Sequence, residues 1–152
     1  MFFKTLNNFL NIAMSITLTI VFISVTICCA YLHHKEKQTL EVAKVICAEA
    51  CSENNLVMFG VGSTIRNRMI QKNISAYAVV TEKNQYYGYT NINKNKIFEN
   101  IKCKTTAIFI AKHINELPDM VNGGIYFRFK NEPKQSWHKK LTQIIEKAEF
   151  YQ

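Results

Sequence analysis

The chain has 152 residues, of which 48% are hydrophobic and 20% are charged, and its formal net charge at pH 7 is +8. This composition excludes a disordered polymer, and the length excludes a multi-domain enzyme. The chain therefore has room for one compact domain in addition to any targeting segment.

An apolar segment, Phe9 to Leu32, contains no formally charged residue. It exceeds the roughly 20 residues with which a helix crosses a bilayer. The pattern predicts a transmembrane helix or a signal segment at 9–32, between a short tail at 1–8 and a charged linker at 33–39. The length favours an uncleaved anchor, because the apolar region of a signal has about 7 to 15 residues. Basic residues on both sides leave the orientation open.

The rest of the chain, residues 40–152, is long enough to form a single domain with its own core. Without Lys4, the basic surplus leaves +7 on residues 31–152. This surplus attracts an anionic partner, such as nucleic acid, anionic lipid or an acidic wall polymer, although a solvated basic surface explains it equally well. No basic run, zinc-ligand spacing or RNA-recognition signature favours nucleic acid. We expect no nucleic-acid partner, no metal and no cofactor.

Three cysteines lie outside the apolar segment, namely Cys47, Cys51 and Cys103. An odd number without regular spacing does not predict a disulfide framework. Cys47 and Cys51 share one face of a helix, but a metal site would need further ligands that the sequence does not identify. We therefore expect these cysteines to be small buried hydrophobic side chains.

Helical periodicity is found in four segments, namely residues 40–52, 56–70, 105–117 and 141–152. Thr39 is expected to cap the first of these helices, which carries a broad apolar stripe. Gly60 and Gly62 lie inside the second segment, where each glycine costs about 1 kcal/mol relative to alanine. They predict the close approach of a neighbouring helix, most simply the first one.

Strand and turn signals are fewer. Residues 85–89, Gln-Tyr-Tyr-Gly-Tyr, combine aromatic rings with an amide and predict either a carbohydrate platform or a β-hairpin with cross-strand aromatic pairs. Asn122-Gly123-Gly124 predicts a turn into a strand at 125–129. Trp137 is expected either to cap the core or to form the floor of a groove. The predicted fold class is α+β, mainly helical with a small β element, after an N-terminal transmembrane helix or signal segment.

The order and spacing of several short motifs resemble the SleB/CwlJ-type cell wall hydrolases, the spore cortex-lytic family. These motifs are Ala48-Glu49-Ala50 with Glu53 four residues after Glu49, Asn67-Arg68, Gln85-Tyr86, Gly123-Gly124-Ile125-Tyr126-Phe127 and Phe150-Tyr151. The resemblance covers about Val42 to Tyr151. The chain departs from the family pattern at Cys51-Ser52, at Val57 and at Ala148.

The resemblance implies a lysozyme-like catalytic domain at 40–152 that acts on peptidoglycan. Members of this family are usually described as lytic transglycosylases, which cut between N-acetylmuramic acid and N-acetylglucosamine and leave a 1,6-anhydro sugar, and the expected activity is that of a lytic transglycosylase or a muramidase. Glu49 is then the catalytic acid and base. The residues expected to bind substrate or to support the site are Glu53, Asn67, Arg68, Gln85, Tyr86, Tyr87 and Tyr126.

The expected chemistry agrees with the surroundings of Glu49, since a carboxyl group in an apolar setting tends to stay protonated near neutral pH. Glu49 would donate this proton to the glycosidic oxygen and then accept a proton from the C6 hydroxyl, so no second carboxylate is needed. The expected partners are peptidoglycan glycan strands and, through residues 9–32, the membrane. The domain would face the wall or periplasm, or be secreted if the segment is cleaved. A membrane-tethered module that binds peptidoglycan or a partner protein without cleavage is the alternative.

Overall fold

A computed structural model describes residues 2–83, 85–90, 94–136 and 138–152, with the side chains of 2–13, 87, 88 and 94 excluded. Trp137, for which a core or groove role was expected, lies outside the described residues. Internal contacts divide the chain into two units, residues 1–37 and residues 38–152. The described chain is mainly helical, with one small sheet and an N-terminal apolar helix.

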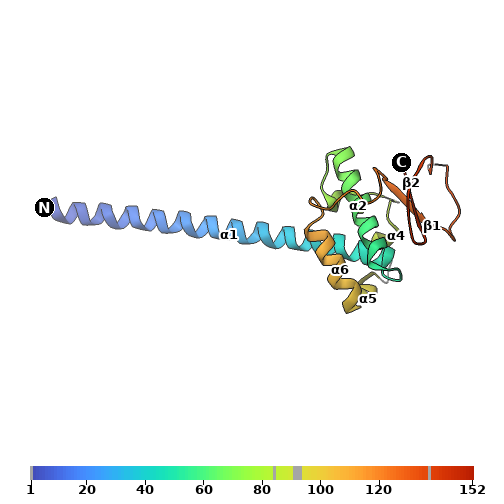
Figure 1. Cartoon of the computed structure of the whole chain (residues 1–152). Helices are drawn as coiled ribbons and strands as arrows, with labels where there is room; N and C mark the ends of the chain where they lie inside the picture. The colour runs from blue at the N-terminus through green and yellow to red at the C-terminus, as the bar shows by residue number, and fades with distance from the viewer. Residues whose placement is uncertain (1, 84, 91–93, 137) are drawn as a thin grey trace. The chain divides into compact units, whose positions relative to one another are not determined.

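The first unit belongs to α1 (Phe2–Ala50), the continuous helix that runs from dark blue to cyan in Figure 1. Within the described residues, α1 is the one helix long and apolar enough to cross a membrane, and its apolar stretch is unburied. These properties fit a membrane anchor and a signal sequence equally.

Hydroxyl groups in the apolar part of α1 hydrogen-bond to their own helix. Thr19 and Thr26 each donate to the carbonyl four residues earlier at 2.9 Å, and Ser24 does so at 2.6 Å. Such bonds satisfy hydroxyl groups that would otherwise be costly in hydrocarbon. The three polar side chains are therefore compatible with an apolar environment.

Residues 33–39, expected to be a linker, are helical and form part of α1. Thr39 is consequently not an N-cap, and this prediction was wrong. The segment His-His-Lys-Glu-Lys-Gln contains no proline or glycine, and Lys, Glu and Gln favour helix formation. A charged stretch between two apolar stretches therefore continues the helix instead of breaking it.

Among its described residues, the second unit contains the end of α1 and five further helices. They are α2 (Asn55–Lys72), α3 (Ala76–Thr81), α4 (Tyr87–Thr90), α5 (Lys94–Phe98) and α6 (Ile101–Lys112). Asn54 begins α2 by accepting a hydrogen bond from the Val57 N–H at 3.0 Å, and Asn73 ends it in a left-handed conformation with φ 53°. These caps fix both ends of the central helix.

A three-stranded antiparallel sheet follows, with strand order β1-β3-β2. Its strands are β1 (Tyr126–Phe129), β2 (Leu141–Ile145) and β3 (Ala148–Tyr151). The turn before β1 is as predicted, since Asn122 and Gly123 have φ values of 50° and 76°. The helix expected over 141–152 is wrong, because this segment forms the β2–β3 hairpin. Glu146 takes φ 55° at its tip, and short apolar runs suit a strand or a helix equally.

The core collects fully buried side chains from α1, α2, α6 and β3, including Ile46, Val61, Ile110 and Phe150. The glycines of α2 face different neighbours from those expected. A Cβ at Gly60 would lie 2.6 Å from Phe150 Cζ, and a Cβ at Gly62 would lie 2.4 Å from Ile110 Cγ2. The close approach was therefore predicted correctly, but the neighbours are β3 and α6 instead of α1.

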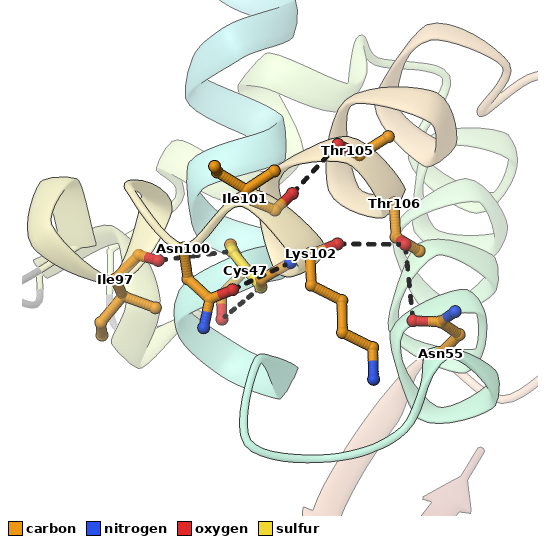
Figure 2. Close-up of a disulfide and its surroundings, with 9 residues drawn as sticks. Cys47, Asn55, Ile97, Asn100, Ile101, Lys102, Thr105 and Thr106 are labelled. Carbon is orange, nitrogen blue, oxygen red and sulfur yellow. Dashed lines mark hydrogen bonds between the residues drawn. A yellow bond between two sulfur atoms is a disulfide. The ribbon is translucent and has the colours of Figure 1, made fainter.

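The expectation for the cysteines is also corrected. Cys47 on α1 and Cys103 on α6 form a disulfide, with 5.9 Å between their Cα atoms (Figure 2). Both residues are buried, as expected, but they are covalently joined. Their 56-residue separation in sequence carries no local signal of pairing, so only the folded chain reveals the disulfide.

Candidate active site

Arg68 is the centre of the candidate site, although only 3% of its surface is exposed. It lies on α2, and its guanidinium carbon is 5.3 Å from the ring centroid of Tyr86 and 4.9 Å from that of Tyr126. The guanidinium also donates a hydrogen bond to Gln85 Oε1. A cation held over aromatic faces and away from water is attracted more strongly than at an exposed site. Arg68 thus joins three elements that are distant in sequence.

Tyr86 packs deeply beside this cation, with 3% of its surface exposed. Burial raises the pKa of the Tyr86 phenol to about 12, against the lowering effect of Arg68 and with smaller increases from the charges of Glu49 and Glu82. Its hydroxyl forms no hydrogen bond of good geometry with a described residue. The phenol therefore stays protonated at neutral pH.

Glu49 lies one residue before the end of α1 and is half-buried. A negative charge on Glu49 is among the smaller causes that raise the pKa of Tyr86, after burial, so the two side chains lie near each other. Ile46 and Ala50, its neighbours along α1, are completely buried. Glu49 therefore borders the apolar core and retains some contact with solvent.

Arg68, Gln85, Tyr86 and Tyr126 form one group through these contacts, which we call the Arg68 cluster, and Glu49 is assigned to it through its charge effect on Tyr86. Gln85 is exposed and Tyr126 is half-buried, so both can contact a ligand together with Glu49. Arg68 and Tyr86 are too deeply buried to do so. Their position is that of supporting residues, which hold the others in place.

Asn67 does not belong to this cluster, although it precedes Arg68. Its amide donates to Asp119 Oδ1 at 3.0 Å and to the Gly124 carbonyl at 3.1 Å. Successive side chains on a helix point about 100° apart, so neighbours in sequence serve different surfaces. Asn67 fixes α2 to the turn before β1.

The positions of Glu53 and Tyr87, the remaining two candidate site residues, say less about a role in the site. Glu53 is half-buried in the turn after α1, where its N–H donates to the Ala50 carbonyl at 3.1 Å. No interaction described for the resolved side chains connects it with the Arg68 cluster. Tyr87 begins α4, and its side chain lies outside the described part of the chain.

Sequence reasoning missed Asp119, whose carboxylate holds the turn before β1. It accepts hydrogen bonds from the backbone N–H groups of Val121 at 3.2 Å and Gly123 at 2.7 Å, besides the amide of Asn67. Burial acts to raise the pKa of Asp119, but these hydrogen bonds and the charge of Arg66 hold it below its ordinary value. An aspartate after proline and shortly before Asn-Gly-Gly is a turn signal that could have identified it.

A polar row on the sheet was also missed. Tyr126 lies opposite Tyr151, and Arg128 lies opposite Glu149, so their side chains share one face. Glu149 contacts Arg128 at 2.5 Å and accepts a hydrogen bond from the Tyr151 hydroxyl at 2.5 Å. That hydrogen bond and the Arg128 charge lower the pKa of Glu149 despite some desolvation. The row extends from the Arg68 cluster along the sheet, and its signal is the alternation of polar and apolar residues.

A separate pocket of about 490 Å³ opens beside Asn67. Three amide side chains and three apolar or small residues line it, namely Asn67, Gln71, Gln152, Ile70, Gly123 and Ile125. Glu49 is not among its lining residues. The pocket and the Arg68 cluster are therefore different places on the second unit.

The chain was compared with family models, with curated proteins and with solved structures, and none of them matches it. The fold and the site are consequently interpreted from the geometry of this chain alone.

Proposed function

We propose that the second unit is a lysozyme-like domain that cleaves peptidoglycan glycan strands as a lytic transglycosylase. The observation that carries the proposal is the convergence of motif residues on the Arg68 cluster. Glu49, Arg68, Gln85, Tyr86 and Tyr126 come from four short motifs that are distant in sequence. These are the motifs on which the resemblance to the SleB/CwlJ-type hydrolases was based.

In the proposed mechanism, Glu49 supplies the proton and later recovers one. Its carboxyl group donates to the glycosidic oxygen as the bond to the anomeric carbon breaks. The resulting carboxylate accepts the proton of the C6 hydroxyl, whose oxygen attacks the anomeric carbon and closes the 1,6-anhydro ring. Exposed Gln85 and half-buried Tyr126 are the proposed sugar contacts, because a ring packs against C–H groups and an amide bonds hydroxyl groups.

The disulfide supports a location outside the cytoplasm. Disulfides form and persist mainly in oxidising compartments and are rare in the cytosol of most organisms. The Cys47–Cys103 pair therefore agrees with a domain that faces the wall or periplasm after an apolar N-terminal helix. We propose that residues 9–32 hold the domain at the membrane next to its substrate, and that cleavage of this segment would release it.

A non-catalytic peptidoglycan-binding module is the second candidate. The pocket beside Asn67 favours it, because its three amides can bond polar groups of a glycan or peptide stem without involving Glu49. In that case the Arg68 cluster is part of the scaffold only. The two candidates differ in what happens to the glycan after binding.

The test is mass spectrometry of muropeptides that the full-length protein, in detergent micelles, releases from purified peptidoglycan. We expect anhydro-muropeptides from the wild type and none from Glu49→Gln. Glu116→Gln is the matched control, because it makes the same chemical change at an exposed carboxylate outside the Arg68 cluster and should retain cleavage. Reducing-end sugars would keep the site but change the reaction to hydrolysis. Binding without release by folded wild-type protein would instead support the module.

A further inference from the structure

Three sulfur atoms meet where the end of α1 approaches α6. The Sγ atoms of Cys47, Cys51 and Cys103 all lie within 4.8 Å of one another. Cys47 and Cys103 form the disulfide, and Cys51 is a free thiol directly after the end of α1. A thiol this close to a disulfide can undergo thiol–disulfide exchange after a small movement that brings its sulfur in line with the S–S bond, because a thiolate attacks one of the bonded sulfurs from the side opposite the other.

The three cysteines differ in their contact with solvent. Cys47 is fully buried and Cys103 is 4% exposed, whereas Cys51 is half-buried. Burial nonetheless raises the pKa of the Cys51 thiol above its ordinary value. At neutral pH this thiol is therefore mostly protonated and a slow nucleophile, and its reactivity rises with pH.

The spacing of the cysteines decides which of them Cys51 can join in a disulfide. Cys51 donates its N–H to the Cys47 carbonyl at 2.8 Å, so these two residues are spaced as on a helical turn. Cβ atoms four residues apart on a helix are about 5–6 Å apart, while a disulfide needs about 3.5–4.5 Å. A bond between Cys47 and Cys51 would distort the helix end. Cys103, which comes from another helix, carries no such constraint.

The structure also provides a partner for the sulfur that would be released. Cys47 Sγ lies 3.9 Å from the carbonyl oxygen of Ile97, just before α6 (Figure 2). A protonated Cys47 thiol can donate a weak hydrogen bond to that oxygen. The exchanged form therefore leaves no buried S–H group without an acceptor.

We propose that Cys47, Cys51 and Cys103 form an exchange site in which the disulfide moves between Cys47–Cys103 and Cys51–Cys103. The Cys51 thiol loses its proton to water, and its sulfur attacks Cys103 Sγ. The new S–S bond forms as the Cys47–Cys103 bond breaks, and the Cys47 thiolate leaves and takes a proton from water. Electrons and atoms balance without an external oxidant or reductant.

This exchange moves the attachment of α6 along α1 by one helical turn. Four residues of helix correspond to a rise of about 6 Å. The end of α1 or the start of α6 must therefore shift, because a disulfide restricts its Cα atoms to about 4.4–6.8 Å. Glu49 lies between the two attachment points, so exchange changes the helix end that carries it.

Peptide mapping of the full-length protein tests this site. Cleavage after glutamate separates the three cysteines into residues 42–49, 50–53 and 100–116. Protein in detergent micelles is held at neutral or alkaline pH, alkylated, acidified and digested without reduction at mildly acidic pH. Replacement of Cys28 and Cys29 by serine removes the other free thiols.

We expect peptide 100–116 to be linked to 42–49 at the start and, after a fixed incubation time, increasingly to 50–53 as the pH rises, because only the thiolate attacks. Alkylation should move correspondingly from Cys51 to Cys47, about tenfold faster for each pH unit below the thiol pKa. A single linkage to 42–49 at every pH in folded protein would overturn the proposal, as would a link between 42–49 and 50–53.

Two variants complete the test. Cys51→Ser should keep the Cys47–Cys103 linkage at all pH values, which shows that Cys51 is the attacking group. Cys47→Ala should link 50–53 to 100–116 when it is oxidised. Free thiols at both positions in folded Cys47→Ala protein would contradict the proposed pairing. The wild-type mapping decides the matter if this variant does not fold.

Discussion

The guanidinium of Arg68 lies between the rings of Tyr86 and Tyr126, 5.3 Å from one centroid and 4.9 Å from the other. A residue of α2 is thereby joined to the segment before α4 and to the first strand of the sheet. This contact relates helices and sheet at the candidate site, and its loss should be measurable both in stability and in activity.

Replacement of Arg68 by methionine should lower the free energy of unfolding by about 2–4 kcal/mol. The change removes a desolvated cation–π contact and the hydrogen bond to Gln85, while it keeps most of the side-chain volume. Urea denaturation measures the effect. Lys72→Met is the control on the same helix, since its ion pair with Glu82 is surface-exposed and should contribute at most about 1 kcal/mol. Equal effects of the two changes would contradict a special role for Arg68.

The buried phenol of Tyr86 predicts a loss of stability in alkali. Its pKa is about 12 in the folded protein and 10.0 as an ordinary phenol, so the unfolded chain releases this proton first. The stabilisation is complete below about pH 10 and is lost as the pH rises towards about 12, by at most about 3 kcal/mol. Tyr86→Phe should remove this part of the pH dependence. Denaturation curves between these pH values provide the measurement, and identical profiles for both proteins would refute it.

Asp119 predicts the opposite dependence, on the acidic side. Its pKa is held below the ordinary carboxyl value, so its contribution is present above that value and is lost as the pH falls through the lowered pKa. Asp119→Asn should cost about 1 kcal/mol at neutral pH, a discounted figure because the residue is exposed, and should flatten the acid-side profile. Glu116→Gln, which alters a nearby exposed carboxylate, should leave that profile unchanged.

Loss of both possible disulfides should be strongly destabilising. Cys103→Ser removes both pairings of the proposed exchange, Cys47–Cys103 and Cys51–Cys103, and opens a loop closed by residues 56 apart. Loop-closure entropy predicts a cost of about 3–4 kcal/mol. Thermal or urea unfolding of oxidised protein should show this loss, while Cys51→Ser should change stability little. If a reductant lowers the stability of Cys103→Ser as much as that of the wild type, the disulfide is not the cause.

The sequence allowed the prediction of features that have local signals. The turn at Asn122-Gly123 and the strand after it follow from residues that favour positive φ and extended backbone. The β2–β3 hairpin carries no such signal, because Glu146-Lys147 at its tip is not a typical two-residue turn. The β2–β3 segment is extended because β3 pairs with β2 on one side and with β1 on the other.

In the candidate site, too, some features could be predicted from the sequence, and others depend on how the chain folds. The motif resemblance selected Arg68, Gln85 and Tyr86, which the fold brings into contact, whereas periodicity alone did not identify them. It also grouped Asn67 with them, whereas the side chain contacts Asp119 in another direction. Spacing along the chain identifies candidates, and the rotation of each helix decides which of them meet.

The opposite roles of Asn67 and Arg68 have a mechanical consequence. Asn67 hydrogen-bonds to the turn before β1, and Arg68 contacts the aromatic ring of Tyr126. Rotation of α2 about its long axis would therefore break contacts on both sides of the helix. Contacts on two sides of the helix therefore fix its rotation. The hydrogen bonds of Asn67 to the turn before β1 therefore resist small rotations of α2. Such rotations would displace Arg68 from the rings of Tyr86 and Tyr126, although the turn lies outside the Arg68 cluster.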